Sequence, residues 1–283
     1  MQKTKLITMN AKEEISVSIE DNLKKYVPDL FKLMADQNVS WFSINKGYLK
    51  KHKERYKKYQ ENPTEKFEVN FYDLIGNVLL RNDSSSEKFF IYINVILKRL
   101  NVTLNKQQKM MVSKTVRNFL KNFSLDYIHF IGELFFLDRM IWSKEYSLLE
   151  VEHKMKNGKR IDFKLFSIRY QKEVLIEIMN VRLDRLNLNS QSDFQEQLIK
   201  KVGEKIFDKT NGVITDHTFH LQPILWGDRD ELRKVSDYYK NGVEIPINGV
   251  MEPLSYCCFT VGENEPEYRF SGISTLFDNL TPL

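Results

Sequence analysis

The chain has 283 residues, of which 42% are apolar and 29% charged, with a formal net charge of +5. This composition can form a sizeable core and excludes a disordered chain, and the length favours two domains. The two cysteines, Cys257 and Cys258, are adjacent, which excludes a disulfide-built secreted domain and favours a reducing compartment. No apolar stretch has the length of a transmembrane helix or a signal peptide, so the sequence predicts a cytoplasmic protein without membrane association.

The first 125 residues are predicted to be mostly helical, because apolar residues recur there at helical spacing. Residues 1–200 carry 35 Lys and Arg against 25 Asp and Glu, and the run Lys46–Gln60 is strongly basic. Lys and Arg release the counterions of nucleic-acid phosphates. The predicted nucleic-acid-binding residues are therefore Lys50, Lys51, Lys53, Arg55, Lys57 and Lys58. The alternative is that the run is simply the solvated face of a helix.

The pattern changes near Ser124. The elements predicted after it are an apolar helix at Tyr127–Ile141, strands at Ser147–Lys154, Arg160–Ser167 and Val174–Val181, a helix at Gln191–Lys209, a strand at Val213–Leu225, a helix at Asp228–Tyr239 and late strands at Gly242–Ile247 and Ser255–Val261. Asn157-Gly158 predicts a type I′ turn between the first two strands. The sequence thus predicts an α/β (α+β) protein with a helical region over residues 1–125. A mixed-sheet domain with an acidic C-terminal tail follows over residues 126–283.

Two carboxylates are predicted to meet in this sheet. If the second and third strands form a hairpin turning near residues 169–170, then Asp162 lies opposite Glu177. A turn one residue later pairs Asp162 with Met179 and leaves Glu177 diagonal to it on the same face. Adjacent carboxylates repel each other unless a positive charge lies between them, and Mg²⁺ prefers oxygen ligands while keeping waters for substrate phosphates. Such an ion could activate water and stabilise charge on a phosphodiester. The alternative is an exposed hairpin face on which the acids pair with Lys164 and Arg160.

These segments resemble the PD-(D/E)XK nuclease superfamily. The likeness depends on an acid in an apolar helix, on Asp162 in the context Gly-Lys-Arg-Ile-Asp-Phe, on an apolar strand bearing Glu177, and on a polar helix rich in Gln and Lys. It covers residues 126–226 and implies a mixed sheet flanked by helices that cuts nucleic acid with one or two Mg²⁺ ions. It also implies that Asp162 is the motif aspartate, that Glu177 is the acid of the E-x-K element, and that Glu133 is the acid some members supply from the preceding helix.

The sequence departs from the family pattern at Met179, where the family has lysine. Methionine can neither orient a water molecule nor supply positive charge. Some members carry the lysine on another element, and Lys164, two residues after Asp162 on the same strand face, is the catalytic candidate. Further candidates on the following helix are Lys200, Lys201 and Lys205.

The resulting hypothesis is a Mg²⁺- or Mn²⁺-dependent endonuclease, of phage-defence or mobile-element type. Asp162, Glu177 and Lys164 would be catalytic, and Glu133 would join the two acids as a metal ligand. The alternative, which Met179 favours, is a catalytically inactive nuclease-fold protein that binds nucleic acid or a protein partner. A third interpretation is an unrelated α/β interaction protein. The choice between DNA and RNA, and the existence of a homo-oligomer, stay open.

Overall fold

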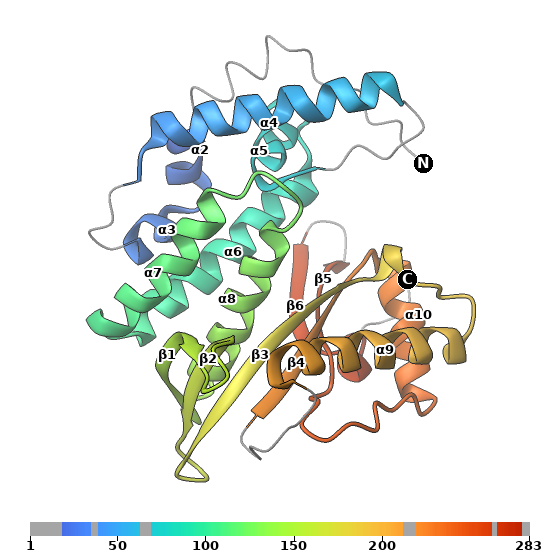
Figure 1. The fold of residues 1–283 in the computed structure, drawn as a ribbon. Coiled ribbons are helices and arrows are strands. Elements are labelled where there is room, and N and C mark those ends of the chain that lie inside the picture. The colour runs from blue at the N-terminus through green and yellow to red at the C-terminus, as the bar shows by residue number, and fades with distance from the viewer. Residues whose placement is uncertain (1–18, 35–38, 63–68, 212–218, 262–264, 279–283) are drawn as a thin grey trace. The chain divides into compact units, whose positions relative to one another are not determined.

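The computed structural model describes residues 19–34, 39–62, 69–211, 219–261 and 265–278 (Figure 1). The protein is helical in its N-terminal part and has a mixed sheet in its C-terminal part, as the sequence predicts. It divides into two compact units, residues 1–134 and 135–283. The division falls inside helix α8 (Tyr127–Trp142), whereas the sequence places it at residue 125. No helix in the described ranges is long and apolar enough to cross a membrane.

In the residues that the structure describes, the N-terminal unit consists of helices packed around aromatic rings. In chain order they are α2 (Ile19–Tyr26), α3 (Pro28–Leu33), α4 (Trp41–Glu61), α5 (Phe71–Arg81), α6 (Ser84–Thr103), α7 (Lys106–Leu120) and the first half of α8. At the centre, the ring of Phe71 lies 5.2 Å from that of Phe90 and 4.5 Å from that of Phe119, both edge-to-face. This is the arrangement that aromatic rings favour, and it joins helices α5, α6 and α7 into one core.

Two asparagines cap helices of this unit with the same local geometry. Asn70 precedes α5 and Asn105 precedes α7, and each forms a capping box with the third helical residue. Their surroundings differ, because Asn70 is fully buried and also donates to the carbonyl of Phe123 at 3.1 Å, whereas Asn105 is exposed. The buried cap therefore also holds the segment that follows α7.

This difference predicts unequal losses of stability. Asn105→Ala should lower the free energy of unfolding by about 1 kcal/mol, the usual cost of a lost N-cap. Asn70→Ala should cost about 2–3 kcal/mol, because it also leaves the Phe123 carbonyl without its donor. Urea unfolding of both variants measures the difference. Equal losses would mean that the Asn70–Phe123 bond contributes nothing.

The C-terminal unit is built on one sheet whose strands, within the described residues, follow one another in chain order. They are β1 (Tyr146–Lys154), β2 (Arg160–Ser167), β3 (Lys172–Arg182), β4 (Phe219–Trp226), β5 (Leu254–Val261) and β6 (Glu265–Gly272). Strands β1 to β3 form an antiparallel meander, β4 is parallel to β3, β5 is parallel to β4, and β6 is antiparallel to β5. Parallel neighbours need a crossover, which α9 (Gln191–Thr210) provides before β4 and α10 (Arg229–Lys240) before β5.

Helices cover the two faces of this sheet. On the face of α9 and α10 (Figure 1), Leu198 and Val202 of α9 belong to the same buried apolar cluster as Met179 of β3. On the other face, the ring of Phe136 from the C-terminal half of α8 stacks on Phe163 of β2, with centroids 6.2 Å apart. The sheet is thus buried on both sides, which explains the nearly continuous apolar character of β3.

Two local predictions are wrong, and one strand was missed. The β1–β2 turn is not type I′, because Gly158 has a positive φ (84°) but Asn157 does not. Residues 242–247 form no strand, because Val243, Ile245 and Ile247 pack against the apolar cluster without a ladder partner. Strand β6, within the acidic tail, was not predicted. Residues 213–218 of the predicted strand Val213–Leu225 lie outside the described residues.

Candidate active site

Strands β2 and β3 bring Asp162 and Glu177 together. Phe163 is the Cα partner of Ile176, which confirms the register that the predicted turn implies and leaves Asp162 and Glu177 as the first residues beyond this last pair. The ladder between the strands ends at Phe163. Beyond it, Oδ2 of Asp162 accepts the backbone N–H of Ile178 at 2.7 Å. The Asp162 side chain therefore serves as an acceptor where the two strands separate.

Two lysines of α9 reach the second carboxylate. Nζ of Lys205 lies 2.7 Å and Nζ of Lys209 lies 3.0 Å from the same oxygen, Oε1 of Glu177. Glu177 is buried, with 1% of its surface exposed, and such a carboxylate needs compensating charge. Its second oxygen, Oε2, is also buried and makes no hydrogen bond within the described structure. One oxygen is thus doubly paired and the other is available.

Hydrogen bonds and an ion pair join the last turn of α9 to the β1–β2 hairpin. Nζ of Lys209 donates to the carbonyl of Arg160 at 2.6 Å, and Nδ2 of Asn157 donates to the carbonyl of Lys209 at 2.8 Å. Lys159 forms an ion pair with Asp208 at 2.8 Å. These contacts hold the two site lysines over the carboxylates.

The cluster changes the proton affinities of its members. Burial, together with the negative charge of Glu177, raises the pKa of Asp162 to about 7, although the Ile178 amide and the two lysines oppose the rise. For Lys205, burial lowers the pKa, but the attraction and hydrogen bond of Glu177 outweigh it and leave the pKa above its ordinary value. Lys205 is therefore a stable ammonium group at neutral pH.

The donor set can be compared with the needs of a metal ion. In the described part of the chain, no group of three or more His, Cys, Asp or Glu side chains is placed to hold one. Mg²⁺ is nevertheless commonly held by one or two carboxylates, with waters and substrate phosphates completing its shell. Asp162 and the unpartnered Oε2 of Glu177 fit that smaller requirement.

Lys164, the catalytic lysine predicted from the sequence, has other partners. Its Nζ lies 2.9 Å from Glu173 and 3.7 Å from Glu150, and the hydrogen bond to Glu173 is the main cause of its raised pKa. Its catalytic role stays a prediction, but the cations that contact Glu177 are Lys205 and Lys209.

Lys205 is one of the predicted helix candidates, whereas Lys209 was missed. A signal for both exists in the spacing of α9. Phe194, Leu198 and Val202 form a buried stripe, and Lys205 and Lys209 continue it three and seven residues after Val202. Charged residues that continue the apolar stripe of a helix face the core and require partners there.

Met179 is buried in the apolar cluster against α9, so its side chain contributes packing where the family pattern has lysine.

Glu133 is half-buried on α8 and belongs to the N-terminal unit, whereas Asp162 and Glu177 belong to the C-terminal unit. Its role as a third metal ligand stays a prediction.

The six predicted nucleic-acid-binding residues all lie on α4. The five lysines are exposed and Arg55 is half-buried. Helical spacing places them on two adjacent faces. Lys51, Arg55 and Lys58 line a cavity, whereas Lys50, Lys53 and Lys57 follow one another on the neighbouring face.

Comparisons with protein-family models, curated proteins and solved structures find no match to this chain.

Proposed function

We propose that the protein is a metal-dependent nuclease that hydrolyses phosphodiester bonds at Asp162 and Glu177. The observation that carries the proposal is the contact of 2.7 Å between Lys205 and Glu177, beside the buried carboxyl group of Asp162. It assembles the three groups that the sequence resemblance requires, with the cation supplied by α9. The order of helix α8, strands β2 and β3, and helix α9 is also the order on which the resemblance depends.

Each residue has a definable task in this reaction. Asp162 and Oε2 of Glu177 would hold Mg²⁺ or Mn²⁺, which when bound polarises a phosphoryl oxygen and makes water more acidic. The ammonium group of Lys205 would stabilise the negative charge that develops on the phosphorus oxygens. Lys209 would position Glu177, because it also holds the carbonyl of Arg160. We place the protein in the cytoplasm, where cysteines that form no disulfide, such as Cys257 and Cys258, stay reduced.

A second candidate function is binding of nucleic acid without cleavage. Two observations favour it: Met179 is buried where the family has lysine, and two ammonium groups already compensate the two acids. In that case the cluster would be a structural ion-pair network on a nuclease fold.

The test is cleavage of end-labelled DNA and RNA, single- and double-stranded, by the full chain with Mg²⁺, with Mn²⁺ or with EDTA. We expect cleavage only with metal, and a loss of about 100-fold or more in Asp162→Asn and Glu177→Gln. Circular dichroism checks that both variants fold. Binding without cleavage of any substrate would favour the second candidate, and Met179→Lys should then create activity. If the protein neither binds nor cleaves any of these substrates, both functions are excluded.

A further inference from the structure

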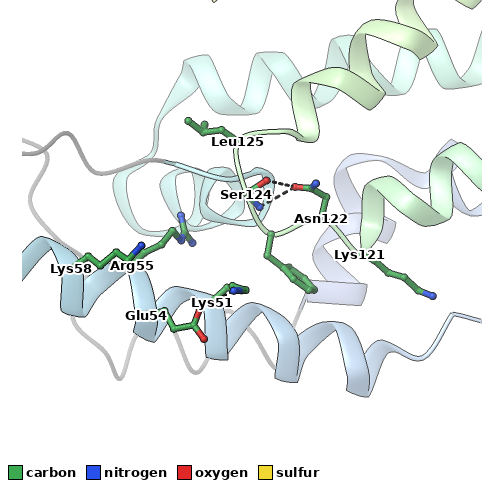
Figure 2. A pocket seen from close by; sticks show the side chains of 9 residues that line it. Lys51, Glu54, Arg55, Lys58, Lys121, Asn122, Ser124 and Leu125 are labelled. Atoms are coloured by element: carbon green, nitrogen blue, oxygen red, sulfur yellow. Dashed lines mark hydrogen bonds and ion pairs between the residues drawn. The ribbon is translucent and has the colours of Figure 1, made fainter. Parts of the chain in front are cut away.

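A cavity of about 350 Å³ lies in the N-terminal unit, between helix α4 and residues 121–125, which connect α7 to α8. Its size is at the lower end of the range of about 300–1,000 Å³ that ligand pockets span. Lys51, Glu54, Arg55 and Lys58 contribute from α4. In Figure 2, Arg55 projects from α4 toward the side on which Asn122 and Ser124 lie, whereas Lys121 extends away at the rim.

The wall opposite α4 is held in place by specific contacts. Phe123 packs so closely on α4 that a Cβ atom at Gly47 would lie 2.6 Å from its ring. The ring also lies 5.7 Å from that of Tyr72, and Asn70 donates to the Phe123 carbonyl at 3.1 Å. The cavity is therefore formed before any ligand arrives, which reduces the entropic cost of binding.

The adjoining residues of this wall are also fixed. Oδ1 of Asn122 accepts the backbone N–H and the hydroxyl of Ser124, both at 2.9 Å (Figure 2). Because the oxygen of the Asn122 amide is used in this way, its NH₂ group is the part left to donate to a ligand. The Ser124 hydroxyl also lies 2.9 Å from Asp126, which keeps one carboxylate near this end of the cavity.

The charges on α4 favour an anion. Arg55 is anchored from behind by the buried Asp73, with Nη1 and Oδ2 2.6 Å apart. Lys51 is paired with Glu54 at 2.9 Å, and Lys58 makes no ion pair with another described residue. Nε and Nη2 of Arg55 are buried, so the guanidinium group contributes positive charge from the wall of the cavity. The two exposed ammonium groups, one turn away on either side, are the groups that can contact the oxygens of a phosphate.

We infer that this cavity binds a phosphate group of a nucleic-acid strand, with Lys58 and Lys51 as the principal contacts and Arg55 supplying positive charge from the cavity wall. The second basic face of α4, formed by Lys50, Lys53 and Lys57, adds positive charge beside the cavity, and this suits a polymer of phosphates better than an isolated ion. The choice of nucleic acid as the source of the phosphate rests on the proposed function. The phosphate chemistry itself does not.

The helix offers a matched control. Lys51 and Lys58 line the cavity and are seven residues apart, and Lys50 and Lys57 have the same spacing on the neighbouring face. Each pair also includes one surface ion pair, Lys51 with Glu54 and Lys57 with Glu61. The double variants K51M/K58M and K50M/K57M therefore remove equal charge and equal surface pairing.

The experiment is titration of a fluorescently labelled single-stranded DNA with the full chain in EDTA, so that binding is measured without cleavage. In about 0.1 M NaCl, K51M/K58M should bind about 25-fold more weakly, because each phosphate contact adds about 0.7 to the salt exponent on single strands. The log–log salt slope should fall by about 1.4, and K50M/K57M should lose about threefold or less through general electrostatics.

Equal losses in the two variants, or no binding at low salt, would overturn the inference. If the unsubstituted protein and the two double variants bind the strand equally well and cleave it normally in metal, the inference is overturned but the nuclease proposal is not. Inorganic phosphate at matched ionic strength separates the two sources of phosphate. If inorganic phosphate displaces little of the bound DNA strand, the cavity binds a phosphate of the strand. If inorganic phosphate displaces the strand fully and chloride does not, the cavity binds free phosphate and the inference is overturned.

Discussion

Replacing Lys205 with methionine should slow metal-dependent cleavage about 100- to 1,000-fold, the usual effect of removing a preorganised charge from an active site. Nζ of Lys205 lies 2.7 Å from Glu177. Burial lowers the pKa of Lys205, but the charge and hydrogen bond of Glu177 raise it further, so the pKa lies above its ordinary value. The side chain is therefore charged through the neutral range. Methionine preserves the packing of the stem but removes the charge. Single-turnover cleavage at saturating metal measures the effect on the chemical step.

Two other lysines show which residue supplies the charge. Lys209 contacts the same oxygen of Glu177 but also holds the carbonyl of Arg160, so Lys209→Met should lower the melting temperature more than Lys205→Met and the rate less. Lys164 is engaged by Glu173, so Lys164→Met should cost much less activity than Lys205→Met. The reverse order, with Lys164→Met inactive and Lys205→Met active, would mean that Lys164 on β2 is the catalytic lysine.

Local signals were sufficient for most of the C-terminal unit. Strands β2 and β3 are apparent in the sequence because each combines apolar residues with a polar turn, and the turn position alone sets their register. Strand β6 was missed because an edge strand has a polar composition that resembles a loop. Residues 242–247 show the opposite error, since alternating apolar residues can pack as irregular chain when no neighbouring strand is available to pair.

The site combines residues that are close in sequence with residues that are far apart in sequence. Asp162 and Glu177 lie on one hairpin, so their meeting depends on a single turn. Lys205 and Lys209 lie on α9, and where they reach depends on contacts such as that between Lys159 and Asp208, 49 residues apart in sequence. Sequence spacing carries no information about contacts of that kind. The lysines of the site could therefore be nominated from the helix pattern but not placed.

Replacing Asp162 with asparagine should stabilise the metal-free protein at neutral and alkaline pH, although the proposed metal site depends on this residue. Burial, with the charge of Glu177, raises the pKa of Asp162 from 3.8 to about 7, so its ionised form disfavours the folded state. Asparagine keeps an acceptor for the Ile178 amide and removes the charge. One pKa unit corresponds to about 1.4 kcal/mol, so the gain is a few kcal/mol at most.

The gain should depend on pH in a definite direction. Below about pH 4 the carboxyl group is protonated in both the folded and the unfolded chain, so the substitution brings no benefit. Between about pH 4 and pH 7 the unfolded chain releases the proton while the folded chain keeps it, so the stability of the unsubstituted protein falls as pH rises. The advantage of Asp162→Asn should grow across this window and level off above it. Thermal unfolding in EDTA at several pH values measures it, and a gain that is constant with pH would contradict the raised pKa.

Metal should reduce this advantage of Asp162→Asn. An ion that binds only the folded state stabilises it by about 1.4 kcal/mol at ten times its Kd. The melting temperature of the unsubstituted protein should therefore rise in Mg²⁺ or Mn²⁺, whereas that of Asp162→Asn should not, with NaCl at equal ionic strength as the control. A different outcome is that neither ion changes the melting temperature of the unsubstituted protein, while Asp162→Asn is still the more stable form in EDTA. Asp162 and Glu177 would then form a purely structural charge cluster with the two lysines of α9. That outcome would exclude metal-dependent cleavage at this site and leave nucleic-acid binding as the function to test.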